Sequence, residues 1–467
     1  CFLVIGGAAI LGIVNNEWLT AVTNEIFSWS LGSFGWLYQI IAMLTLILVA
    51  LLTFTKIGNI RFGGKDAKSK YSFGSWFAMT LTGGIATGLI TYGVNEVLIY
   101  YGNIYGELDG YGIAALSDEA AYFSMGRCFY NWTFIPYAMY ALSVLAIALG
   151  LASSLGAGLA LIGTGLSSAY GIAQGPIVWI ALTAIITITF TVASVTGIDK
   201  GIKWLAGLTS KIFYVLLIVL FILGPTLYIL NMANVGLGYW LDRFWMWGFD
   251  PYTVGGEALV TWWTMYDWAI WIAYAPLMGI FFAIIAYGRT IRQFLVINWI
   301  LPSTFGFVWF SVWGGTALKW QISGKADIIA TIQEQGAVAG IWEFLKHVPL
   351  GSIIIPVIII ALIAAFSTTA DTMSTTIAAL CTKGARHDEE PAIWQKIVWG
   401  VSIGVIACVM VAFGGGAQGV DGVKYLAACG GFVVLIIFIF QVASAIKLFF
   451  FDKETKKDIE EGSKYRD

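Results

Sequence analysis

Residues 261–292 decide the fold class, and they read TWWTMYDWAIWIAYAPLMGIFFAIIAYGRTIR. The stretch is long and apolar enough to cross a bilayer, which takes about 20 residues in a helix. Aromatic rings occupy its first half at helical spacing, at Trp263, Tyr266, Trp268, Trp271 and Tyr274. Because ring faces carry partial negative charge, such a cluster can hold a quaternary ammonium group, which donates no ordinary hydrogen bond. Five rings within about 18 Å of helical rise exceed what an interfacial aromatic belt, the alternative interpretation, requires.

The composition of the whole chain is typical of a membrane protein. Of its 467 residues, 59% are hydrophobic and 11% are charged, whereas a soluble protein carries about 25% charged residues. Several apolar runs exceed the roughly 18 residues that span a bilayer, so we expect an all-α polytopic membrane protein. A net charge of −2 argues against a nucleic-acid partner. Five cysteines without a C-x-x-C pair and two distant histidines argue against a metal site, and we expect no cofactor.

Hydropathy places most of the membrane spans. We expect the first span to end near residue 14, followed by a polar loop at residues 15–17. Residues 327–347 form an amphipathic segment that we expect outside the membrane. The other clear spans are expected at 33–54, 71–101, 208–230, 294–318, 351–380, 394–413 and 425–450. Lys and Arg alternate between loops as the positive-inside rule requires, which predicts twelve crossings of the cell membrane with both termini cytoplasmic.

Residues 137–166 are apolar without a polar turn. A single helix of this length would measure about 45 Å, too long for a hydrocarbon core of about 30 Å. We therefore place spans 4 and 5 here. We expect residues near Gly150 to be joined across a stretch that the numbering omits, and a tight glycine turn is the alternative. The chain begins in an apolar run without Met, so we also expect residues upstream of Cys1.

Two motifs resemble the betaine/choline/carnitine transporter (BCCT) family. The pattern W-T-x-x-x-W-A-x-W runs from Trp263 to Trp271, and G-R-T-I-R begins at Gly288; together they are typical of the family's eighth span. The resemblance covers nearly the whole chain. It implies a leucine-transporter-type fold, in which spans 3–12 form two inverted five-helix repeats, and a homotrimer in membrane lipid. The segments are then two N-terminal helices with a basic loop (1–70), the first repeat (71–257), the second repeat (258–450) and a cytoplasmic tail (451–467).

The resemblance also implies a substrate and a site for it. Members of the family are secondary transporters, not enzymes, and they carry trimethylammonium compounds such as glycine betaine, carnitine, γ-butyrobetaine and choline. In the family, four aromatic positions surround the ammonium group, and in this sequence they are Trp132, Tyr137, Tyr140 and Trp271. We expect Trp268 and Tyr274 to extend the site. Ordinary helix packing is the alternative for the rings of span 4.

Two acidic residues fall inside predicted spans, where a charge is costly and indicates function. Asp267 replaces an aromatic residue that the family often has, and Ile270 and Tyr274 stand where the family commonly has Trp. We include Asp267 among the substrate-binding residues, because it could neutralise the cation; proton coupling, pairing with a lysine and exposure to an aqueous vestibule are alternatives. Glu96 occupies a position where the family usually has an acid, and we expect it to make hydrogen bonds between helices.

A glycine-rich break, TGGIATG, occupies residues 82–88 in span 3. It matches a G-x-G-x-G segment of the family, with Ala86 at the middle position. Glycine lets a helix unwind and lets a ligand approach the backbone, and the freed N–H groups can hold a carboxylate. We therefore expect Gly84, Ala86 and Gly88 to bind the carboxylate of a zwitterionic substrate. Close helix packing is the alternative, and the two interpretations are compatible.

Hydroxyl groups in span 10 favour sodium as the coupling ion. Residues 367–371 read STTAD, and sodium-coupled members of the family have hydroxyl residues just before Ala-Asp. The resemblance implies a sodium site formed by Thr368 and Thr369 with backbone carbonyls of span 3, at Gly83 and Ile85. Hydrogen bonds from these hydroxyls back to helix carbonyls are the alternative.

Other functions remain open from the sequence. A sodium-independent exchanger of the family would carry an Arg in span 7, where this chain has Thr209 and Ser210, which are not basic, although Lys211 is close. An amino-acid symporter on the same fold would need the same broken helix and hydroxyl groups, so substrate competition is required to separate it. A membrane enzyme or an ion channel would need a catalytic constellation or a filter repeat, and the sequence has no evident example of either.

Overall fold

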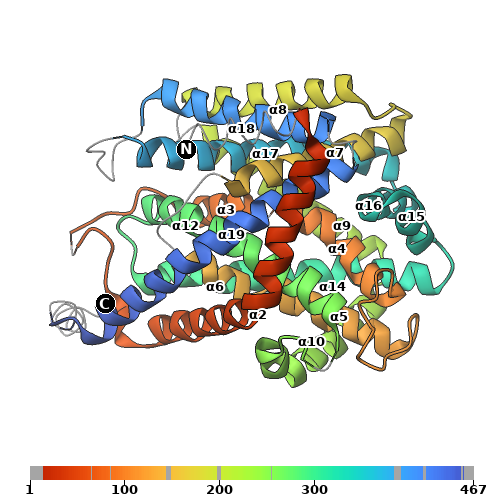
Figure 1. Cartoon of the computed structure of the whole chain (residues 1–467), viewed down its shortest axis with the longest axis horizontal. Helices are drawn as coiled ribbons and strands as arrows, with labels where there is room; N and C mark the ends of the chain where they lie inside the picture. The colour runs from red at the N-terminus through yellow and green to blue at the C-terminus, as the bar shows by residue number, and fades with distance from the viewer. Residues whose placement is uncertain are drawn as a thin grey trace.

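The computed structural model describes residues 14–64, 66–84, 86–142, 149–196, 201–253, 255–382, 391–413, 417–453 and 456. Over these residues the protein is a bundle of helices without strands, and the nearest approach to a sheet is an isolated antiparallel bridge between Arg61 and Thr290. Several helices, among them α8, α17 and α18, run in one common direction across Figure 1. The polytopic all-α class predicted from composition is therefore confirmed.

The first described helix is longer than predicted. Helix α2 (Asn16–Phe54) has 39 residues and includes the stretch that we expected to be a polar loop. The reason is local: the side chain of Asn15 accepts a hydrogen bond from the backbone of Trp18 and caps the helix, and Glu17 lies in its first turn, where an acid is favourable. Figure 1 shows α2 changing direction near its middle. The predicted first span, before residue 14, lies outside the described residues.

The predicted break in span 3 is confirmed. Helix α3 (Phe73–Gly84) ends in the glycine-rich segment and α4 (Ala86–Gly102) begins beyond it, with 58° between their axes. A second interruption follows, because α5 (Asp118–Trp132) and α6 (Phe134–Leu142) are separated at Thr133, whose φ of −120° and ψ of −121° are not helical. Pro136 lies in the first turn of α6, where its missing N–H costs nothing. The predicted join near Gly150 cannot be followed, because residues 143–148 lie outside the described part of the chain.

The middle of the chain holds α7 (Leu149–Tyr170), α8 (Pro176–Thr196) and α9 (Lys203–Leu223). A further helix, α10 (Thr226–Phe249), was not predicted from the sequence. Its polar residues are interleaved with apolar ones, so it has no long apolar run, and several of its large apolar side chains are exposed.

The second half begins with α11 (Glu257–Leu259), the π-helical turn η3 (Val260–Met265) and α12 (Tyr266–Ile285). The predicted spans at 351–380 and 394–413 and the amphipathic segment at 327–347 each coincide with helices within a few residues. The remaining elements are α13 (Ile291–Leu295), η4 (Val296–Ile300), α14 (Leu301–Ile322), α15 (Ile328–Gln335), η5 (Ala337–Ala339), α16 (Gly340–His347), α17 (Gly351–Leu380), α18 (Ile393–Phe413), α19 (Ala417–Ile446) and η6 (Lys447–Phe451).

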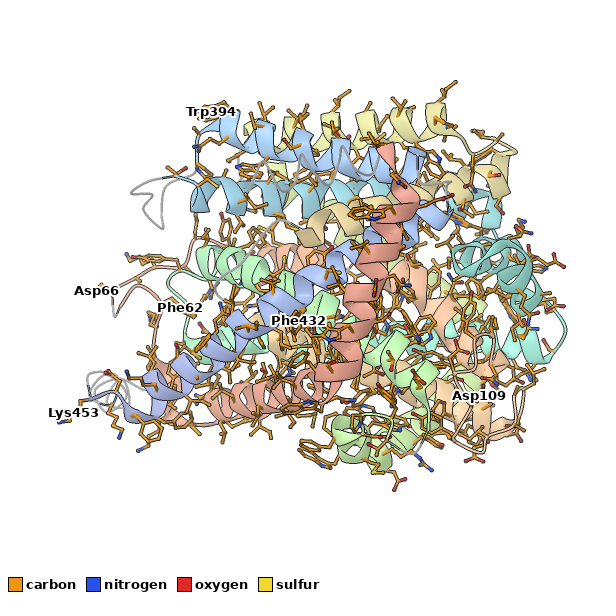
Figure 2. The ribbon with its side chains drawn as sticks, in the orientation of Figure 1. Phe62, Asp66, Asp109, Trp394, Phe432 and Lys453 are labelled. Carbon is orange, nitrogen blue, oxygen red and sulfur yellow. The ribbon has the colours of Figure 1, made fainter. Side chains whose placement is uncertain are left out.

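Among the described residues, six helices are long and apolar enough to cross a membrane, and the bent pair α3–α4 would make a seventh. Twelve crossings therefore stay a prediction. Helix α12 packs against both α6 and α19, and α17 packs against α3, α8 and α9. Figure 2 shows Asp109, in the loop after α4, at the opposite end of the bundle from Asp66 and Lys453. The loop after α4, which carries Glu107 and Asp109, and the basic loop after α2 thus lie at opposite ends of the bundle.

Candidate aromatic substrate site

The structure brings four of the predicted aromatic residues together, and we call this cluster the aromatic box. It consists of Trp132 at the end of α5, Tyr137 and Tyr140 on α6, and Trp271 on α12. The ring centroid of Trp271 lies 6.2 Å from that of Trp132, 5.5 Å from that of Tyr137 and 4.5 Å from that of Tyr140. All four side chains are buried. The break at Thr133 is what lets two consecutive helices both present rings to α12.

The aromatic box is closed in this conformation. Centroid distances between 4.5 and 6.2 Å are those of rings in direct contact, so the rings occupy the space that a trimethylammonium group would need. A ligand must therefore enter with rotation of the rings or separation of α6 from α12. Chemically, the arrangement offers several π faces and few charges, which suits a bulky monovalent cation.

A buried polar network lies behind Trp132. The carboxylate of Glu96 on α4 accepts hydrogen bonds from Trp132 Nε1 (2.5 Å), Tyr100 Oη (2.7 Å) and Asn131 Nδ2 (3.1 Å). Thr264 in η3 donates to Asn131 Oδ1 at 3.2 Å. The predicted role of Glu96 in hydrogen bonding between helices is thereby confirmed.

Sequence reasoning missed the other end of this network. Arg127 is fully buried, its Nη2 donates to Thr264 Oγ1 at 2.5 Å, and its guanidinium lies 5.0 Å from the ring of Tyr130 and 4.8 Å from that of Trp247. A signal was present, since Arg127 and Asn131 are polar residues one turn apart among the mostly apolar residues in the second half of α5.

The two other predicted aromatic residues lie in different surroundings. Trp268 is fully buried and its ring centroid lies 5.8 Å from that of Tyr130, on the α5 side. Tyr274 is buried and close enough to Tyr140 to interact electrostatically with it. Asp267, in the first turn of α12, interacts electrostatically with Tyr100 and Cys128. This acid is therefore near the polar network of α4 and α5.

Gly88 makes room for the aromatic box. A Cβ at this position would lie 2.8 Å from two ring carbons of Trp132, so any side chain larger than hydrogen would push the indole away. This contact supports close packing as one role of the glycine-rich segment. Of Gly84 and Ala86 the structure gives the helical backbone only, and Ile85 lies outside the described residues.

The predicted ion-binding hydroxyls lie where α17 meets α3. Thr368 Oγ1 donates to the carbonyl of Ala364 at 2.8 Å. Thr369 Oγ1 is 3.1 Å from the carbonyl of Ala365 and 3.5 Å from that of Thr82 on α3. Gly83 is buried nearby, with space for a Cβ at ordinary contact distance from Thr372. Both hydroxyls thus bond back to their own helix, and Thr369 also reaches the broken span.

Outside the membrane-spanning segments, Glu107 in the loop after α4 contacts η3. Its carboxylate accepts from Trp263 Nε1 at 3.2 Å and from the backbone N–H of Tyr105 at 2.9 Å. Burial raises the pKa of Glu107 above its ordinary value of 4.5, although both hydrogen bonds oppose this change. Trp263 is therefore held at the loop rather than in the aromatic box.

The G-R-T-I-R motif joins the loop after α2 to the turn after α12. Arg292, on α13, donates to the carbonyls of Thr53 (2.9 Å) and Thr55 (2.7 Å) at the end of α2 and to Asn59 Oδ1 (2.8 Å). The planar guanidinium can satisfy several carbonyls at a helix C-terminus at once. Arg289 precedes α13, donates to the carbonyl of Tyr71 and lies over the ring of Phe73.

Long apolar helices define a polytopic membrane protein, and the aromatic box is its candidate internal site for a cation. The sequence matches the family described as BCCT, betaine/carnitine/choline family transporter, over residues 1–149 and 141–454. The chain therefore belongs to this family of membrane transporters. The two matched parts overlap at residues 141–149, next to the join predicted near Gly150.

Relatives named as transporters match most of the chain. An ectoine/hydroxyectoine transporter of Virgibacillus pantothenticus is 27% identical over 87% of each chain. A probable glycine betaine transporter of Desulfitobacterium hafniense (strain Y51) is 27% identical over 93% of each chain. An osmo-independent choline transporter of Acinetobacter baylyi is 25% identical over 92% of this chain and 88% of its own. These relatives differ in substrate, so membership of the family defines a transporter without defining its cargo.

Proposed function

We propose that this protein is a secondary active transporter that carries a trimethylammonium compound across the cell membrane by alternating access. The observation that carries the proposal is the aromatic box, in which buried rings from α5, α6 and α12 meet around Trp271. Aromatic cages are the usual way in which proteins bind quaternary ammonium groups. Relatives named for glycine betaine and choline support this substrate class.

The carboxylate of a zwitterionic substrate would bind at the helix break formed by Gly84, Ala86 and Gly88. The break between α3 and α4 supports this role, because helix ends expose backbone groups that are free to bind an anion. Trp268, Tyr274 and Asp267 would then lie beside the site. Twelve crossings, cytoplasmic termini and a homotrimer in lipid complete the proposal, as the family resemblance implies.

Sodium is the proposed coupling ion, held by Thr368, Thr369 and carbonyls at Gly83 and Ile85. The approach of Thr369 Oγ1 to the carbonyl of Thr82 supports this assignment, since it places a hydroxyl of α17 beside the backbone of α3. Thr209 and Ser210 on α9 are uncharged, so this helix supplies no cation to replace sodium at these two positions.

The decisive experiment is uptake into proteoliposomes that contain the purified full-length chain. Radiolabelled glycine betaine, choline and carnitine are offered with and without an inward sodium gradient, and with substrate or buffer inside. We expect saturable uptake of at least one compound that depends on sodium. Uptake that requires internal substrate and ignores sodium would identify an exchanger instead. Uptake of an amino acid that none of the three compounds inhibits would overturn the proposal.

A further inference from the structure

Glu96 is buried among hydrogen-bond donors that belong to the wall of the aromatic box. Its side chain is fully buried, and the donors Trp132, Tyr100 and Asn131 are at most 6% exposed. Oε2 accepts from the indole of Trp132, and Oε1 accepts from both other donors. All three side chains donate to the carboxyl oxygens, so Glu96 is the acceptor in every one of these hydrogen bonds, and the bond from Trp132 is the shortest of the three. The indole therefore has a strong, single anchor.

This anchor determines which way the indole face of Trp132 points. The indole has one N–H, and Glu96 is its partner. The rest of the ring packs between Gly88, Tyr92 at 5.3 Å and Trp271 at 6.2 Å. These apolar contacts would tolerate a rotation of the ring, whereas the hydrogen bond would not, because it weakens steeply away from linearity.

The same carboxylate connects the two walls of the box. Asn131, which donates to Glu96, accepts from Thr264 in η3, and Thr264 accepts from Arg127. Because η3 leads directly into α12, the chain of hydrogen bonds runs from Trp132 to the start of the helix that carries Trp271. Movement of α12 relative to α5 must strain or break this chain.

We propose that Glu96 is the positioning residue of the aromatic box: its carboxylate fixes the orientation of Trp132 toward Trp271 and thereby sets the affinity for the ammonium group. Glu96 acts through the indole and does not contact the substrate. This inference rests on the proposed function of the aromatic box, and it adds a residue that determines how well the box is formed.

The first test substitutes Glu96→Gln in the full chain. Glutamine has one acceptor oxygen and an NH2 group that must face a donor. The hydrogen bond from the indole of Trp132 is therefore lost or competes with Tyr100 and Asn131 for the one remaining oxygen. In detergent, the indole N–H resonance of Trp132, assigned by its loss in Trp132→Phe, should move toward the position of a weakly bonded indole. The dissociation constant for glycine betaine should rise about tenfold, since a reoriented ring loses part of its cation–π contact.

A matched control removes the same kind of bond elsewhere. Glu107→Gln weakens the carboxylate–indole bond to Trp263, whose ring packs against Tyr100 at 5.2 Å and Tyr92 at 6.4 Å but is not part of the aromatic box. Its expected result is a shifted Trp263 resonance with an unchanged dissociation constant. If Glu107→Gln weakens binding as much as Glu96→Gln does, a general loss of packing explains both, and the proposal is overturned.

A double-mutant cycle separates positioning from folding. Trp132→Phe keeps an aromatic ring without the N–H, so it should also weaken binding, and adding Glu96→Gln should then change the dissociation constant less than about twofold. If the two substitutions instead weaken binding by factors that multiply in the double mutant, Glu96 does not act through the indole of Trp132. An unmoved Trp132 resonance in Glu96→Gln would contradict the proposal in the same way. If wild-type protein binds no quaternary ammonium compound, the proposed function fails, while the resonance still decides whether Glu96 orients Trp132. Should Glu96→Gln not fold, Trp132→Phe alone must show the weaker binding.

Discussion

Replacing Trp271 by Leu tests the aromatic box most directly. The ring of Trp271 contacts those of Trp132, Tyr137 and Tyr140, and the side chain is 5% exposed. A desolvated cation–π contact contributes about 2 kcal/mol, which corresponds to a roughly 30-fold weaker dissociation constant for glycine betaine or choline. The loss of three ring pairs, at about 1 kcal/mol each, should also lower the free energy of unfolding.

The assay must separate these two effects. Equilibrium binding is measured in detergent and uptake in proteoliposomes, each beside a thermal unfolding curve. Trp271→Phe, which keeps a smaller π face, should fall between wild type and Trp271→Leu in affinity. Trp313→Leu is the matched control, because Trp313 is 1% exposed and its ring packs on Trp309 at 4.8 Å and near Phe344 at 5.8 Å, neither of which belongs to the aromatic box. It should lose stability and keep its affinity. Affinity near wild type in Trp271→Leu would remove this ring from the site.

Three further predictions test the ion site, the loop and the G-R-T-I-R motif. Thr369→Ala should raise the sodium concentration for half-maximal uptake about tenfold. Thr376→Ala, whose hydroxyl bonds back to the carbonyl of Thr372 on its own helix, should leave that concentration unchanged, and equal values for both would argue against the proposed site. Because the pKa of Glu107 is raised by burial, its protonation adds stability that is fully present below pH 4.5 and is lost as the pH rises through the raised value. Wild type should therefore gain thermal stability over Glu107→Gln as the pH falls toward 4.5, and parallel curves would contradict this. Arg292→Lys keeps the charge but cannot reach all three acceptors, so it should cost about 2 kcal/mol of unfolding free energy, and an unchanged melting temperature would disprove that Arg292 holds the end of α2.

Hydropathy and local signals predicted much of the helical order. The apolar runs that became α17 and α18 were placed within a few residues, and the glycine-rich segment was correctly predicted to interrupt a span. Prediction failed where local chemistry was ambiguous. Polar residues 15–17 suggested a loop, yet they start a helix, because a capping Asn and an early Glu also favour a helix N-terminus. Helix α10 has no long apolar run and gave no span signal.

The family resemblance predicted which aromatic residues surround one ligand, but residue spacing alone did not predict that their rings meet. Trp132 and Trp271 are far apart in the chain, and no periodicity predicts that their rings lie 6.2 Å apart. Trp268 shows the limit of spacing arguments: it is one turn from Trp271 on the same helix, yet its ring packs against Tyr130 instead. The direction of each side chain depends on which helices pack on either side of α12.

The sequence by itself determined that the chain crosses a membrane as helices and that its rings suit a cation, because helix formation and burial in lipid depend on neighbouring residues and on composition. Only the tertiary structure decided how closely the rings of the aromatic box approach one another and which groups hold them. Glu96 reaches Trp132 across 36 positions, and Arg292 reaches the end of α2 across more than 230. Such contacts arise from the packing of whole helices, and that packing is a property of the folded chain rather than of any one segment.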